Sequence, residues 1–95
     1  MTQEQRPLEI LVIDDDEGIR ILLQRLIKGE NVDTAVDGQE GIDMYVQRYE
    51  EGTPYDAVLT DLSMPRATGV DVTRRVKELS SGTLVYVITG MELTQ

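Results

Sequence analysis

A chain of 95 residues has room for one small domain, and its 18 acidic and 9 basic side chains give a formal net charge of −9. It has no cysteine and no histidine, which excludes disulfides, thiolate metal sites and the Ser-His type of catalytic triad. The acidity argues against nucleic acid and anionic membranes as partners, because clustered Lys and Arg bind both. A polar start and the lack of a long apolar run predict a cytoplasmic protein.

The first part of the chain changes from a strand pattern to a helix pattern and back. Residues Leu8–Ile13 are nearly all apolar and branched, which is typical of a strand buried on both faces. Apolar residues at helical spacing over Ile19–Ile27, with Leu26 on the inward face, predict an amphipathic helix. Asn31–Val36 reads as a short strand with Val32, Thr34 and Val36 on one face.

The same alternation continues to the end of the chain. Helices are predicted over Gln39–Tyr49 and Val70–Leu79, and strands over Tyr55–Thr60 and Leu84–Thr89. Strands that alternate with helices at this spacing favour a parallel α/β sheet with helices on both faces.

Polar side chains stand where three of the predicted strands end. Asp14 and Asp15 follow the first strand, Asp61 follows the third, and Thr89 ends the fourth. Ligands of open parallel sheets bind beyond the carboxyl ends of the strands. If the first and third strands are neighbours, we expect the three carboxylates to converge at one edge.

Three converging carboxylates repel one another, and a hard divalent cation such as Mg²⁺ would relieve that repulsion. Such a site suits phosphoryl transfer, in which a carboxylate can act as the nucleophile and form an aspartyl-phosphate. An aspartate after a strand is often only a turn former or helix cap, and our interpretation of Asp16 and Glu17 is a cap or a solvated charge. The functional interpretation therefore depends on the combination of acids in the right strand order.

Four segments, in this order, resemble the receiver domain of two-component response regulators. They are Ile10–Asp16, a hydrophobic strand with an acid pair; Asp37–Gly41, a polar turn; Leu59–Pro65, a phosphoacceptor loop with Met-Pro; and Val87–Gly90, a switch hydroxyl with a small neighbour. Gly69 after the Met-Pro loop matches as well. The resemblance covers nearly the whole chain and implies a flavodoxin-like, doubly wound parallel sheet.

The resemblance also implies roles for individual residues. Asp61 would accept a phosphoryl group from a phosphohistidine on a sensor histidine kinase or a phosphotransfer protein. Asp15 would ligate Mg²⁺ directly and Asp14 through water, while Asp61 and the backbone carbonyl of Ser63 would complete the protein ligands. Thr89 would bind the phosphoryl group. The protein would be a phosphoacceptor with self-catalysed phosphotransfer rather than an ordinary enzyme.

The sequence also departs from the family pattern. Receivers have a fifth strand with a phosphoryl-pairing lysine and further helices, whereas residues 1–95 are expected to form a domain truncated to four strands and three helices. Lys28 and Lys77 lie on helices in the wrong places to substitute. The strand over 84–88 would then be an exposed apolar edge, for which we expect self-association. The alternative function is a non-phosphorylatable module that acts through self-association or partner binding.

A second alternative comes from the spacing of Asp14 and Asp16, which superficially fits haloacid-dehalogenase phosphatases. Gly18 stands where that family prefers Thr or Val, and the chain is short for its core. The two hypotheses differ in the nucleophile, which would be Asp14 in a phosphatase and Asp61 in a receiver.

Overall fold

The computed structural model describes residues 6–88, which form one four-stranded sheet and three helices. The elements are β1 (Glu9–Ile13), α1 (Glu17–Leu26), β2 (Asn31–Ala35), α2 (Gly38–Glu50), β3 (Ala57–Asp61), α3 (Gly69–Leu79) and β4 (Leu84–Ile88). The predicted alternation of strands and helices is confirmed, with shifts of one or two residues at most ends. The predicted end of the fourth strand, Thr89, lies outside the described residues.

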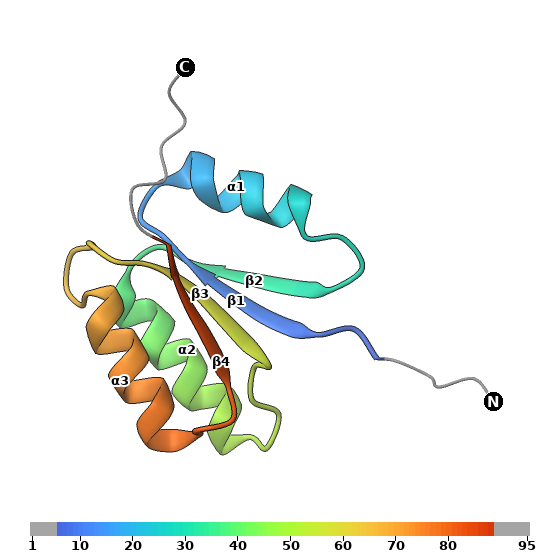
Figure 1. Cartoon of the computed structure of the whole chain (residues 1–95), viewed down its shortest axis with the longest axis vertical. Coiled ribbons are helices and arrows are strands. Elements are labelled where there is room, and N and C mark those ends of the chain that lie inside the picture. Colours follow the sequence, from blue (N-terminus) through green and yellow to red (C-terminus); the bar gives the residue numbers. More distant parts are fainter. Residues whose placement is uncertain (1–5, 89–95) are drawn as a thin grey trace.

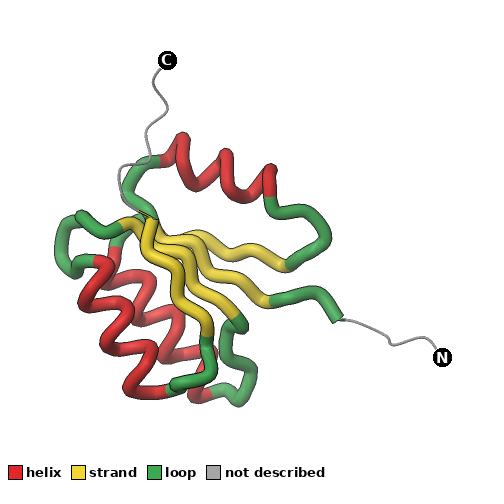
Figure 2. Tube along the Cα trace, viewed as in Figure 1, coloured by secondary structure: helices red, strands yellow, loops and turns green. Residues whose placement is uncertain are grey.

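The strands are all parallel and follow the order β2-β1-β3-β4. This is the flavodoxin-like order, in which the chain reverses its direction of winding between β1 and β3. Helix α1 covers one face of the sheet, and α2 and α3 lie together on the other (Figure 1). Figure 2 shows the same layers, with the strands between the two sets of helices. The doubly wound α/β fold predicted from the sequence is therefore confirmed.

Alternating side chains of the central strands form a separate core on each face of the sheet. Leu11 and Val58 pack under α2 and α3, whereas Ile10 and Val12 pack under α1. Leu11 and Val58 are fully buried, as expected for strands covered on both sides. These buried strands support the carboxyl edge of the sheet, which is the side at which the parallel strands end.

Each helix begins at a side chain that caps its free amide groups. The carboxylate of Asp16 accepts from the Ile19 amide at 3.1 Å, so its interpretation as a cap is confirmed. Asp37 caps α2 in the same way. Helix α3 begins with a capping box, in which Thr68 and Asp71 each accept from the other's amide. These caps fix where the loops at the carboxyl edge turn into helices.

Two apolar residues on the predicted faces of their elements are exposed. Val36 is 48% exposed because β2 ends at Ala35 and the Val36 amide turns to donate to the Glu40 carboxylate at 2.7 Å. Leu26 is 64% exposed because it is the last residue of α1, which is anchored to the sheet mainly through Ile19 and Leu23.

Helix α2 approaches β1 closely at Gly41. A Cβ atom at this position would lie 2.3 Å from Cδ1 of Ile13 and 2.7 Å from its Cγ1, so the glycine permits the contact. Ile13 is branched at Cβ and 1% exposed, and therefore has little freedom to move aside. The close contact fixes α2 against the strand that leads into Asp14.

We predict that Gly41→Ala destabilises the protein by about 1–2 kcal/mol, because the overpacking cost exceeds the helix propensity gained. Urea unfolding followed by circular dichroism measures the difference. The matched control is Gly82→Ala, because a Cβ there meets no atom within 4 Å. Equal stability of the two variants would contradict the packing argument.

Candidate functional site

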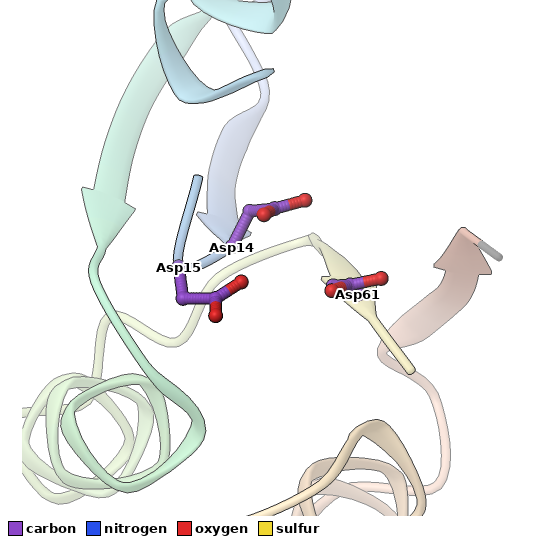
Figure 3. Close-up of side chains that lie close together, drawn as sticks. All are labelled: Asp14, Asp15 and Asp61. Atoms are coloured by element: carbon purple, nitrogen blue, oxygen red, sulfur yellow. The ribbon is translucent and has the colours of Figure 1, made fainter. Parts of the chain in front are cut away.

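The carboxyl edge of the sheet gathers three aspartates. Parallel pairing places Ile13 of β1 opposite Thr60 of β3, so the acids that follow on each strand meet at the same edge. Oxygen atoms from the three carboxylates lie within 4.8 Å of one another. Figure 3 shows Asp14 and Asp15 at the end of β1 and Asp61 at the end of β3. The convergence expected from the sequence is therefore observed.

Asp14 is the buried member of the trio, with 6% of its surface exposed. Burial raises the pKa of its carboxyl group, and the negative charges of Asp61 and Asp15 raise it further. The Asp16 amide, which donates to Asp14 Oδ1 at 2.9 Å, opposes these effects only in part. The site therefore disfavours its own negative charge, and a bound cation would offset that cost.

Asp61 is half-buried and is set by the loop that follows it. Its Oδ1 accepts from the Leu62 amide at 2.9 Å, and the Leu62 carbonyl accepts from the Gly69 amide at 2.8 Å. A Cβ at Gly69 would lie 2.4 Å from the Asp61 carbonyl oxygen, so only glycine lets α3 start this close. The glycine noted after the Met-Pro loop thus has a steric cause.

The loop between β3 and α3 is held against the start of α2. Arg66 has a φ of 73° and sits at the centre of a tight turn in which the Ala67 amide donates to the Pro65 carbonyl at 2.8 Å. Its guanidinium pairs with Asp37 at 3.3 Å. Positive φ in a residue other than glycine is strained, and the surrounding contacts must maintain it.

The fold places four of the predicted site residues within residues 6–88. It brings together Asp14, Asp15 and Asp61, and it places Ser63 on the exposed loop two residues after Asp61. Thr89 lies outside the described residues.

One basic residue beside this edge was not predicted from the sequence. Nη1 of Arg20, on α1, donates to the backbone carbonyl of Asp14 at 2.7 Å. The available signal was a basic side chain one helical turn after the capping Asp16, on the helix that follows the acidic run.

A second polar cluster lies at the opposite end of the sheet, where β1 begins. Arg6 binds both carboxylate oxygens of Asp56, at 3.0 and 2.9 Å, and Arg48 pairs with Glu9 at 3.1 Å. These cations and anions satisfy one another within residues 6–88. The cluster is therefore a structural network that joins the strand starts, in contrast to the unbalanced acids at the carboxyl edge.

The fold and the acidic edge define a class, namely doubly wound α/β proteins with a carboxylate cluster at the point where the winding reverses. The family model for the response regulator receiver domain matches residues 10–95, and the chain belongs to this family. This membership also argues against the phosphatase alternative.

Similar proteins agree with this assignment. The chain is 33% identical over 88 residues to the response regulator MprA of Mycolicibacterium vanbaalenii and 31% identical over 84 residues to ArlR of Staphylococcus aureus. These alignments cover 90% and 86% of this chain but 36% of each relative. A crystal structure of a CheX-CheY-BeF3-Mg²⁺ complex from Borrelia burgdorferi matches with a TM-score of 0.80 and 27% identity, over 90% of this chain and 63% of that one.

Receiver domains generally accept a phosphoryl group on an aspartate, bind Mg²⁺ in an acidic pocket and interact with histidine kinases or phosphotransfer proteins. The present chain spans about a third of the length of the curated relatives above. None of the helices within residues 6–88 combines the length and apolarity needed to cross a membrane.

The raised pKa of Asp14 predicts a pH-dependent effect of Asp14→Asn in the metal-free protein. The folded state holds the Asp14 proton more tightly than the unfolded chain does. The contribution of this group to stability is therefore present below its usual pKa of 3.8 and is lost as the pH rises through the raised pKa of the folded state. We expect Asn to stabilise the protein at pH 7 by on the order of 1 kcal/mol, with the gain shrinking toward pH 4.

Urea unfolding in the presence of a chelator measures this difference at both pH values. Asp43→Asn, on the exposed side of α2, is the control for a loss of one charge away from the cluster. A stabilisation by Asp14→Asn that is no larger than that of the control would contradict the electrostatic interpretation.

Proposed function

We propose that residues 1–95 act as a receiver domain that takes a phosphoryl group onto Asp61 from a phosphohistidine, in the cytoplasm and with Mg²⁺. The donor would be a sensor histidine kinase or a phosphotransfer protein. The observation that carries the proposal is the gathering of three carboxylates within 4.8 Å at the carboxyl edge of the sheet. Membership of the receiver family supports the direction of transfer.

In this proposal Asp61 is the nucleophile. The Leu62 amide donates to its Oδ1, which orients the carboxylate and leaves the second oxygen to attack phosphorus. A bond forms between that oxygen and phosphorus while the bond from phosphorus to the imidazole nitrogen of the donor breaks. The imidazole keeps the bonding electron pair and takes a proton from solvent. The chain therefore promotes a transfer onto itself and does not turn over a separate substrate.

The donor set fits Mg²⁺, because every group at the edge offers a hard oxygen atom. Asp15 is exposed and would ligate the ion directly, while Asp14, which is buried and bonded to an amide, would act through water. Asp61 and the carbonyl of Ser63 would complete the protein ligands, and Thr89 would bind the transferred phosphoryl group. Bound Mg²⁺ neutralises negative charge on the transferring group.

We predict that incubation with acetyl phosphate and Mg²⁺ adds one phosphoryl group to the chain, and that Asp61→Asn abolishes this addition because it removes the nucleophile. Intact-mass spectrometry measures the gain. Chelation of Mg²⁺ should suppress it in the unmodified protein.

The control variant is Asp43→Asn, which removes an exposed carboxylate on α2 and should be phosphorylated normally. A gain that persists in Asp61→Asn would place the acceptor elsewhere. No gain in a folded protein that binds Mg²⁺ would refute phosphotransfer and leave the cation site standing.

A second candidate function is self-association through β4, and the exposure of this strand favours it. Within residues 6–88, β4 lies at one edge of the sheet, with Leu84 and Tyr86 each 55% exposed and Val87 40% exposed. Unpaired backbone groups beside apolar side chains form a template for another strand. A second copy of this chain would offer the same edge.

We predict that the 95-residue chain forms a concentration-dependent dimer and that Tyr86→Lys prevents it, because a charged side chain at the edge opposes strand pairing. Sedimentation velocity measures the molar mass across a dilution series. The control is Val70→Lys, which places the same charge on an exposed position of α3. A monomer at every concentration would refute this second function without affecting the first.

A further inference from the structure

Arg20 is the basic side chain that reaches the backbone at the acidic edge. It lies on α1, is half-buried, and its Nη1 donates to the carbonyl oxygen of Asp14 at 2.7 Å. A charged donor at this distance makes a strong hydrogen bond. The bond joins α1 to the residue at which the chain leaves β1.

The Asp14 carbonyl belongs to the peptide unit that links Asp14 to Asp15. Because a peptide unit is planar, holding its oxygen also fixes the direction of the Asp15 amide nitrogen and Cα. The orientation of this plane determines where the Asp15 side chain leaves the backbone. Arg20 therefore acts on the geometry of Asp15 without touching its carboxylate.

The two aspartates differ in how else they are held. Asp14 is buried, its amide donates to the Ala35 carbonyl at 3.2 Å, and its carboxylate accepts from the Asp16 amide. Asp15 is exposed, and no hydrogen bond to its carboxylate forms within residues 6–88. The position of Asp15 thus depends on the backbone on either side, and Arg20 fixes one of these sides.

We propose that Arg20 is a positioning residue for the cation site, which holds the Asp14–Asp15 peptide plane so that Asp15 points at the ion. This inference rests on the proposed function, in which Asp15 is a direct Mg²⁺ ligand. Arg20 itself does not contact the ion.

If Arg20 acted only through its charge, its removal would change the Mg²⁺ affinity in the direction opposite to that expected of a positioning residue. The Arg20 guanidinium carries a positive charge close to the cation site, so its removal alone would strengthen Mg²⁺ binding. Loss of a group that orients a ligand instead weakens binding, by roughly 10–100-fold for supporting residues of metal sites. The sign of the change therefore separates positioning from electrostatics.

The test compares Arg20→Met and Arg20→Lys with Arg25→Met, which removes the same charge from the exposed last turn of α1. Calorimetric titration of the metal-free 95-residue protein with MgCl₂ gives the dissociation constant. We expect Arg20→Met to raise it by about 10-fold, Arg20→Lys to recover part of the loss, and Arg25→Met to stay close to the unmodified protein. Unchanged or tighter binding in Arg20→Met would overturn the proposal.

A second readout does not need the ion. Residue-resolved amide hydrogen exchange by NMR reports the turn, since the Asp16 and Ile19 amides are hydrogen-bonded there. Faster exchange at both amides in Arg20→Met, with α2 unchanged, supports positioning and shows that the variant is folded. Exchange rates equal to those of the unmodified protein would overturn it.

The two proposals fail in different ways. One outcome is that the unmodified protein binds no Mg²⁺ while Arg20→Met still speeds amide exchange in the turn after β1. This result would refute the cation site and support the role of Arg20 in orienting the peptide plane. If the unmodified protein binds Mg²⁺ and Asp15→Asn abolishes this while Arg20→Met does not weaken it, the site stands and the role of Arg20 is refuted.

Discussion

The parallel pairing of β1 with β3 is the contact on which the carboxyl edge depends. It puts Ile13 beside Thr60, and the acids that follow these residues then meet across a few ångströms. Leu11 and Val58 are fully buried, so a shift in register would expose apolar side chains and is strongly disfavoured. The hydrophobic cores on the two faces thus fix the spacing of charged groups that would otherwise repel one another.

The carboxyl edge, where these charges lie, also contains local features that are energetically unfavourable. Burial raises the pKa of Asp14 and so disfavours its charged form, and Arg66 holds a positive φ in the neighbouring loop. Nearby groups offset part of these costs, since the Asp16 amide donates to Asp14 and the Asp37 carboxylate pairs with Arg66. Costs of this kind cluster where a chain must present groups to a ligand, and residues 6–88 place them around the same strand ends.

Hydrophobic periodicity predicted the elements well, because long apolar faces dominate the signal in a doubly wound sheet. It failed at Val36 and Leu26, since Val36 follows the last residue of β2 and Leu26 is the last residue of α1, and neither side chain faces the core. The acid trio was predictable from strand ends once β1 and β3 were assumed to be neighbours. The contact of Arg20 was not, because it joins a side chain to a carbonyl, and a sequence does not show which way a carbonyl points.

Helix α1 connects this contact to the stability of the fold. Within residues 6–88 it is the helix on its face of the sheet, and Ile19 and Leu23 are its buried side chains. Arg20 follows Ile19 directly, so docking of Ile19 on β1 brings the guanidinium to the Asp14 carbonyl. A change that loosens α1 would therefore also release the peptide plane between the two aspartates. In the proposed cation site, affinity and helix docking would therefore be linked, and an ion that requires the held plane would in turn stabilise α1 against the sheet.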